Sequence, residues 1–260
     1  MKTLLTNDDG IMAPGLWAIA EQVSGLGDVM VVAPDREQSA TGTCVTLRQP
    51  LRVRRIESLI TGIPTYSVEG SPSDSVILAL EKLTRQAELV ISGINQGANL
   101  GDDVLISGTV GAALQGYLRN LPAIAISSAN IEGRHLEAAA RLAALLAARI
   151  EKKILPNDVF LNVNLPDLPL SEIKGIKITR LAHKTHIDNV KEGHDGRREY
   201  YWLVRSRLSQ EVDPKTDIWA IENGYISVNA LHASLFGRPP LTEREKLCDE
   251  LMEELLQDTV

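Results

Sequence analysis

Short apolar segments alternate with longer helix-forming segments along the first 150 residues of the chain. Five short runs are typical of buried strands, and they cover residues 2–6, 28–34, 65–70, 88–93 and 122–127. Four longer runs favour helices, and they cover residues 13–27, 71–84, 107–120 and 135–150. This order predicts an α/β fold with a doubly wound, mostly parallel sheet and right-handed crossovers.

The second half of the chain has a different pattern. Further strands are expected at 159–166, 173–182 and 225–231, and a short helix at 216–224. A polar stretch at 183–198 leads into the aromatic strand 199–208, which predicts a long hairpin projecting from the body. We expect a single domain over residues 1–260, with this protruding hairpin at about 180–208 and a C-terminal amphipathic helix at about 241–256.

The net charge limits the classes of partner that the chain is expected to bind, and the cysteine content indicates the cell compartment. The formal net charge of −7 weighs against nucleic acid but not against a small phosphorylated ligand, which a cation or backbone N–H groups can hold. The two cysteines, Cys44 and Cys248, fit no zinc spacing and favour the reducing cytosol. We expect no signal peptide and no membrane segment, because the N-terminus has no apolar h-region and charges interrupt the longest apolar run.

Two adjacent carboxylates, Asp8 and Asp9, follow the first predicted strand and precede Gly10. Their mutual repulsion and partial burial are both relieved by a hard divalent cation, which prefers oxygen ligands. Gly10 permits a turn that brings both side chains toward one ion. An aspartate that caps the following helix explains the pair equally simply, and for the pair taken alone that is the favoured interpretation.

Two further loops carry polar residues. The loop after the second strand contains the hydroxyls of Ser39 and Thr41, which suit a cation or a phosphate but also ordinary turn chemistry. The loop at 93–103 is rich in Gly, Asn and Asp and leads to a predicted helix start at Ser107. Backbone N–H groups and hydroxyls at such a start suit a phosphate, although for Ser107 taken alone an ordinary N-cap is the favoured interpretation.

The position of the three loops is more informative than any one of them. The carboxyl ends of parallel strands meet at one edge of a doubly wound sheet, and ligands bind there. A carboxylate pair, a hydroxyl loop and a Gly/Asn loop before a helix therefore share one edge. A cation beside a phosphate site predicts phosphoryl chemistry.

The motifs at these loops resemble those of the SurE (survival protein E) family of metal-dependent nucleotidases. The similarity covers Met1 to about Leu231 in consistent order. The segments that carry it are NDDG, APDREQSATG, EGSPSDSV, SGINQGANLGDDV, SGTVGAA, LNVNLP and TDIWAIENGYISV. The resemblance implies a Rossmann-like three-layer α/β/α fold with a C-terminal hairpin arm. It also implies that partners exchange these arms to make homodimers or homotetramers.

The resemblance further implies a 5'- and 3'-nucleotidase that releases phosphate from nucleoside monophosphates and in some members degrades short polyphosphate. One divalent cation, Mg²⁺ or Mn²⁺, is implied for each subunit. Its ligands carry over to Asp8, Asp9, Ser39 and Asn95, which makes the two aspartates the expected catalytic residues as well. The residues expected to bind the phosphate are Asn99, Ser107, Gly108 and Thr109.

Some positions depart from the family pattern, and none is an expected ligand. Ile106 stands where Tyr is common, and Gln115 where Glu is common. Asn229 and Ala230 replace a Thr-Pro pair, and Ser234 replaces an Asp found in some members. These departures leave the preferred nucleotide and the rate open, along with any role for the region near His232.

We expect a water molecule, either activated at the cation or oriented by Asp8 or Asp9, to attack the phosphorus in line, while the group that protonates the leaving oxygen stays unassigned. Two alternatives remain. A haloacid-dehalogenase-like phosphatase needs two aspartates separated by one residue, whereas Asp8 and Asp9 are adjacent. A non-catalytic nucleotide sensor remains open, although a dinucleotide-binding version is weakened because no G-x-G-x-x-G follows the first strand.

Overall fold

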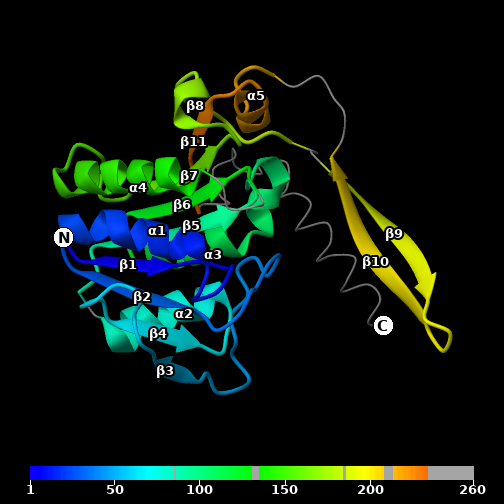
Figure 1. Ribbon diagram of the computed structural model, residues 1–260, viewed down its shortest axis with the longest axis horizontal. Coiled ribbons are helices and arrows are strands. Elements are labelled where there is room, and N and C mark those ends of the chain that lie inside the picture. The colour runs from blue at the N-terminus through cyan, green and yellow to red at the C-terminus, as the bar shows by residue number, and fades with distance from the viewer. Residues whose placement is uncertain (85, 131–134, 184–185, 208–212, 234–260) are drawn as a thin grey trace, which may run out of the picture.

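A nine-stranded sheet forms the centre of the computed structural model, which describes residues 1–260 except 85, 131–134, 184–185, 208–212 and 234–260 (Figure 1). In spatial order the strands are β3 (Val53–Arg55), β4 (Thr65–Val68), β2 (Val29–Pro34), β1 (Thr3–Thr6), β5 (Leu89–Gln96), β6 (Ala123–Ser128), β7 (Phe160–Leu165), β11 (Ile226–Ala230) and β8 (Ile176–Ile178). The strands from β4 to β7 are parallel, whereas β3 and β11 run antiparallel to β4 and β7. The predicted α/β fold with a mostly parallel sheet is confirmed.

Helices cover both faces of this sheet. The largest core cluster contains α1 (Pro14–Val23) and α4 (Leu136–Glu151), which lie side by side in Figure 1. Residues of α2 (Pro72–Leu78) and α3 (Gly108–Tyr117) pack on other strand residues in separate clusters. Short helical segments complete the layers: η1 (Ser24–Leu26), η2 (Ala79–Leu83), η3 (Gly101–Leu105), η4 (Leu170–Glu172) and α5 (Asp217–Glu222).

The predicted helix starts follow local capping chemistry. Ser71 is the N-cap of α2, and its hydroxyl accepts a hydrogen bond from Asp74 N at 3.0 Å. Asp74 Oδ2 accepts one from Ser71 N at 2.9 Å, which completes a capping box. These bonds satisfy N–H groups that would otherwise lack a partner at the start of α2.

A separate two-stranded hairpin projects from the body (yellow in Figure 1). It pairs β9 (His186–His194) with β10 (Glu199–Arg207) antiparallel, so the predicted hairpin within 180–208 is confirmed. The predicted helix at 241–256 and Cys248 lie outside the described residues. Among the helices that are described, each is too short or too polar to cross a lipid bilayer.

Two strands differ from the prediction. β3 was not expected, because its Val-Arg-Arg sequence is exposed at the sheet edge and lacks the apolar pattern of a buried strand. β5 continues to Gln96, so Asn95 lies on the strand itself rather than in the following loop. The parallel register that pairs Asn95 with Ser127 extends the strand past the glycine at which the sequence suggested an end.

The strand order places a switch point beside β1. The chain passes from β1 to β2 on one side and returns to β5 on the other. The carboxyl ends of β1, β2 and β5 are therefore neighbours, which is where open α/β sheets bind ligands.

Candidate active site

The Asp8–Asp9 pair lies at the carboxyl end of β1, in a turn closed by Gly10. Asn7 Nδ2 donates a hydrogen bond to Gly10 O at 2.9 Å. Gly10 has a φ of +99°, and a Cβ there would lie 3.0 Å from the backbone carbon of Arg36. The positive φ and the close backbone both favour glycine, so the sequence around the pair is fitted to this turn.

Asp8 is buried against the N-terminus of α3. Its Oδ1 accepts a hydrogen bond from the Thr109 hydroxyl, and a Cβ on Gly108 would lie 2.9 Å from its Oδ2. The helix that directly follows the pair, α1, has Ala13 at its N-cap. The interpretation of the pair as caps of the following helix is therefore wrong, because Asp8 meets a helix about a hundred residues further along.

Asp9 faces the end of β5. The N–H of Gln96 points to its Oδ2 at a long 3.4 Å. Burial, and next the neighbouring Asp8 charge, raise the pKa of Asp9 to about 7. Burial also raises the pKa of Asp8, against the opposing effect of the Thr109 hydroxyl. Two raised pKa values show that negative charge is weakly compensated at this point of the protein.

The second loop closes over the same turn. Gln38 N donates to Asp8 O at 2.7 Å, and Gly42 N donates to Ile106 O at 2.9 Å. The Ser39 hydroxyl donates to Glu37 Oε1 at 2.6 Å. The charge of Glu37 raises the pKa of both Asp8 and Asp9, so a third carboxylate acts on the pair. Glu37 is not among the residues predicted from the sequence, although it stands only two residues before Ser39.

The two asparagines of the third loop have different surroundings. Asn95 Nδ2 donates to Gly97 O at 2.7 Å, which holds the side chain over the loop and leaves Oδ1 as its potential cation ligand. Asn99 is buried, and its Nδ2 donates to Ser127 Oγ at 2.9 Å. One of the two amide hydrogens of Asn99 is therefore committed to β6, and the other is the one that a phosphate would meet.

Two asparagines on β7 hold the backbone of Asn99. Asn164 Oδ1 accepts from Asn99 N at 2.8 Å, and Asn164 Nδ2 donates to Asn99 O at 3.1 Å. Asn162 Nδ2 donates to the same oxygen at 3.0 Å. Both β7 asparagines are fully buried. The sequence identifies the LNVNLP segment only as a family motif. Alternating asparagines on a strand do not show which distant backbone groups they bind.

The start of α3 combines capping with contact to Asp8. Ser107 is the N-cap, and its hydroxyl accepts from Val110 N at 3.1 Å. The ordinary capping role of Ser107 is therefore present. Gly108 brings the backbone of α3 against Asp8, since any side chain there would overlap it. Three of the residues expected to bind phosphate lie together at the start of α3: Ser107, Gly108 and Thr109. The fourth, Asn99, is in the preceding loop and bonds residues of β6 and β7.

The donor set fits a hard cation. Among the described residues, no three His, Cys, Asp or Glu side chains gather as a metal site, so hydroxyl and amide oxygens would have to complete the carboxylate pair. Also within the described part of the chain, the buried oxygens Thr6 Oγ1, Asn7 Oδ1 and Ser92 Oγ find no hydrogen-bond partner. Asn7 directly precedes the two poorly compensated carboxylates, and an oxygen with spare lone pairs there suits a divalent cation or its bound water.

The departures from the family pattern have different surroundings, and among the described ones no hydrogen bond joins them to the proposed cation ligands. Ile106 is 39% exposed beside Ser107, and Gln115 is buried on α3, where its Oε1 accepts from Arg119 Nη1 at 3.3 Å. Asn229 Nδ2 donates to Thr179 Oγ1 at 2.9 Å, and Ala230 is the exposed last residue of β11. Ser234 lies outside the described residues.

Comparison with known proteins identifies the family. The sequence model described as Survival protein SurE matches residues 3–188. The chain belongs to the SurE family. It is 59% identical over 248 residues to the 5'-nucleotidase SurE of Dehalococcoides mccartyi strain CBDB1, covering 94% of each chain. It is 43% identical over 236 residues to the 5'-nucleotidase SurE of Legionella pneumophila strain Philadelphia 1, covering 90% of this chain and 92% of that protein.

A solved SurE structure supports the fold. The crystal structure of the SurE protein from Aquifex aeolicus matches with a TM-score of 0.79 and 35% sequence identity. The match covers 97% of this chain and 100% of that one. The doubly wound sheet described above is therefore shared by a family member of moderate sequence identity.

Proposed function

We propose that this SurE-family protein is a metal-dependent nucleotidase that hydrolyses nucleoside 5'- and 3'-monophosphates. The relatives from D. mccartyi and L. pneumophila carry the name 5'-nucleotidase SurE, which supports the reaction class. The observation that carries the proposal is the Asp8–Asp9 pair at the switch point, in which Asp8 is buried against the start of α3 and Asp9 is half-buried. Hydrolysis of short polyphosphate is a further expectation for the same centre.

In this proposal Asp8, Asp9, Ser39 and Asn95 hold one Mg²⁺ or Mn²⁺ ion. A cation bound there supplies charge that compensates the phosphate and favours ionisation of a water molecule. The Thr109 hydroxyl fixes the Asp8 carboxylate by donating to its Oδ1. The Ser39 hydroxyl, now turned to Glu37, would offer its oxygen lone pairs to the ion.

The phosphate would lie at the start of α3. Asn99, Ser107, Gly108 and Thr109 are the proposed donors, and backbone N–H groups at a helix start favour an anion. Donors fixed before the reaction stabilise charge on the phosphoryl oxygens at no cost of reorganisation in the transition state. The capping bond of Ser107 and the contact of Thr109 with Asp8 hold this helix start in place.

The hairpin arm supports the proposed homodimer or homotetramer by arm exchange. Its exposed apolar side chains include Val190 at 56%, Trp202 at 66% and Leu203 at 83% exposure. Apolar surface of this kind on a projecting hairpin suits a second copy of the chain.

The cytosolic location stays a prediction that rests on cysteine usage.

The proposal is tested by measuring phosphate release from a panel of 5'- and 3'-nucleoside monophosphates, with Mg²⁺, Mn²⁺ or EDTA. We expect release with either metal and none with EDTA. D8N and D9N should abolish release, whereas D28N is a matched control, since Asp28 is an exposed aspartate before β2 at the opposite edge. Full metal-dependent activity in D8N or D9N would show that the assignment is wrong.

The same assay separates the two alternatives. A phosphorylated aspartate trapped after acid quenching would favour the dehalogenase-like phosphatase. Nucleotide binding without phosphate release under every metal condition would favour a non-catalytic sensor.

A further inference from the structure

Another buried carboxylate, Asp217, lies at the start of α5, far in sequence from the Asp8–Asp9 pair. It is fully buried, and it accepts hydrogen bonds from the backbone N–H groups of three residues. Its Oδ2 accepts from Gly101 N at 2.7 Å, and its Oδ1 accepts from Ala182 N at 3.0 Å and Ile218 N at 2.9 Å. One side chain therefore joins three segments of the chain.

The first of these segments leads into the proposed phosphate site. Gly101 begins η3, and the turn continues through hydrogen bonds from Ile106 N and Ser107 N to Asp103 O, at 3.1 and 3.0 Å. Ile106 O in turn accepts from Gly42 N in the second loop. Hydrogen bonds joined by the short backbone segment from Gly101 to Asp103 thus connect Asp217 with the start of α3 and with the loop over Asp8.

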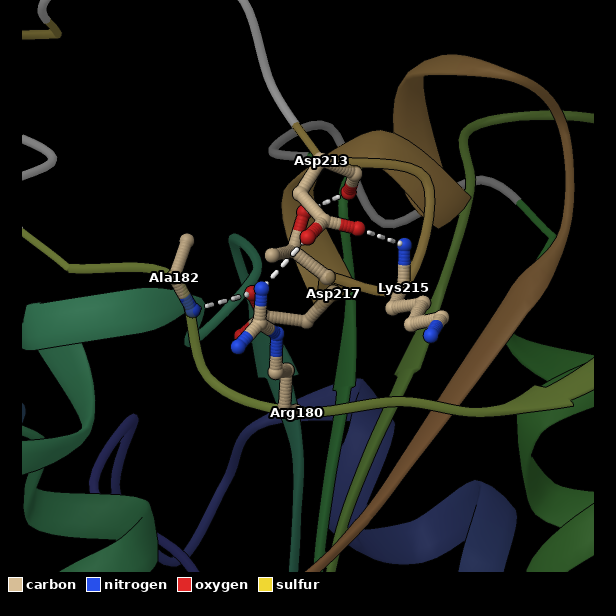
Figure 2. A network of polar contacts seen from close by, with 6 residues as sticks. Arg180, Ala182, Asp213, Lys215 and Asp217 are labelled. Carbon is tan, nitrogen blue, oxygen red and sulfur yellow. Dashed lines mark hydrogen bonds and ion pairs between the residues drawn. The ribbon is translucent and has the colours of Figure 1, made fainter.

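The second segment is the stem of the hairpin arm. Ala182 stands four residues before β9 begins at His186. Figure 2 shows this stem beside the entry to α5, with Ala182 N directed at Asp217 and Arg180 paired with Asp213. Asp217 N donates to Arg180 O at 3.0 Å, so backbone and side chain of Asp217 both hold the stem.

Apolar packing supports the same junction. Leu100, Ala182 and Ile218 form one buried cluster. Ala182 and Ile218 themselves donate N–H groups to Asp217, and Leu100 directly precedes the third donor, Gly101. The carboxylate therefore lies beneath a small apolar cover, where an unmade hydrogen bond is expensive. Burial raises the pKa of Asp217, and the backbone N–H groups of Gly101, Ala182 and Ile218 act against that rise.

From this geometry we propose that Asp217 is a positioning residue that ties the phosphate-site loop to the stem of the arm. It touches no reacting atom and acts through Gly101 on one side and Ala182 on the other. An effect of Asp217 on the rate of phosphate release rests on the proposed nucleotidase function, whereas the link between the loop and the stem does not. One carboxylate then links the position of the arm's stem to the alignment of the start of α3.

Asp217→Asn tests the tie with almost no change of shape. An amide has one acceptor oxygen, so the oxygen can keep the two bonds from Ala182 and Ile218 only if its NH₂ faces Gly101 N. We expect amide hydrogen exchange at Gly101 and in η3 to quicken on the order of 10- to 100-fold in ligand-free protein, the loss expected for one charged hydrogen bond. Unchanged exchange in η3 and at 180–183 would overturn the proposal.

Asp213→Asn is the matched control, because Asp213 belongs to the same network but is exposed and bonds Lys215 N at 2.8 Å rather than the loop. With a nucleoside monophosphate and Mn²⁺, D217N should lower kcat on the order of 10- to 100-fold, as expected for a misplaced binding loop. Its Mn²⁺ affinity should stay within about twofold of wild type, because the proposed cation ligands are on other segments. D213N should match wild type in both, and a D217N enzyme with unchanged kcat would contradict the positioning role.

The two hypotheses fail separately. If the wild type releases no phosphate, the proposed function fails and the exchange comparison alone decides the tie. If D217N does not fold, hydrogen exchange in the wild type tests the tie instead. The tie requires that the amides of Gly101 and Ala182 open as one unit. Their exchange rates should then rise by the same factor as urea is added. Independent responses of these two amides would overturn the tie.

Discussion

Asp217 and the Asp8–Asp9 pair, two aspartate centres in the described part of the chain, have different hydrogen-bond surroundings. Asp217 receives three backbone N–H groups at 2.7 to 3.0 Å. In the Asp8–Asp9 pair, Asp8 receives the Thr109 hydroxyl and its charged form is also favoured by the backbone N–H groups of Thr109 and Asp8, whereas Asp9 receives a long contact from Gln96 N, and the two carboxylates repel each other. A carboxylate that the backbone satisfies is fitted to hold the fold. A pair left short of donors is fitted to receive positive charge from outside.

The largest expected effect separates activity from stability at the first centre. We predict that Asp9→Asn lowers phosphate release by on the order of 1,000-fold or more, because it removes a proposed cation ligand. The same variant should not lower the melting temperature of the metal-free protein, since it removes repulsion with Asp8. Phosphate release with Mn²⁺ and thermal melting in EDTA measure the two quantities. A large loss of metal-free stability would place Asp9 with Asp217 as a structural residue.

A large effect on stability is expected at the asparagines that hold the third loop. Asn164→Ala removes the acceptor for Asn99 N and one of two donors to Asn99 O, so the buried N–H of Asn99 loses its partner while Asn99 O keeps the bond from Asn162. We predict a loss of about 2–4 kcal/mol in the free energy of unfolding, measured by urea titration. Asn189→Ala, on the exposed hairpin, is the control and should change it by less than about 0.5 kcal/mol. Equal stabilities would mean that the β7 amides do not hold the loop.

A smaller effect is expected from the hydroxyl that bonds Asp8. Thr109→Val keeps the shape of the side chain but removes the donor to Asp8 Oδ1. Groups that orient a metal ligand typically change metal affinity by about 10- to 100-fold when lost, so we predict weaker Mn²⁺ binding in that range. Calorimetric titration measures it. Thr43→Val in the neighbouring loop is the control, and an unchanged affinity in T109V would separate Thr109 from the cation site.

The smallest effect is a pH dependence of the metal-free protein. The pKa of Asp9 is about 7 in the fold and near its ordinary value of 3.8 when unfolded, so the folded state holds the proton more tightly. This contribution to stability is full below about pH 4 and is lost as the pH rises toward 7. Melting temperature in EDTA should therefore be lower at pH 7.5 than at pH 5.5, and D9N should flatten the difference. A wild-type protein that is more stable at pH 7.5 would contradict the raised pKa.

The repeating pattern of strands and helices could be predicted because each element depends on residues that are close together in the sequence. The capping box of Ser71 and Asp74 and the apolar runs of β1, β2 and β6 depend on neighbours in sequence. The Arg-rich edge strand β3 was missed because its pairing with β4, rather than its own residues, makes it a strand.

The candidate site was predictable in position but not in its contacts. Strand order places the ends of β1, β2 and β5 together, so the NDDG turn and the two polar loops could be assigned to one edge. The contact of Asp8 with Thr109 and the tie of Asp217 to Gly101 join residues about a hundred positions apart. Such pairs follow from the packing of α3 and α5, which no local pattern encodes.

The central claim is that the Asp8–Asp9 pair, and not Asp217, is built to receive a divalent cation. Calorimetric titration of Mn²⁺ into the wild type, D8N, D9N and D217N tests it most directly. The account predicts one Mn²⁺ per chain in the wild type and D217N, and loss of that binding in D8N and D9N. Wild-type Mn²⁺ binding retained in both D8N and D9N would contradict it.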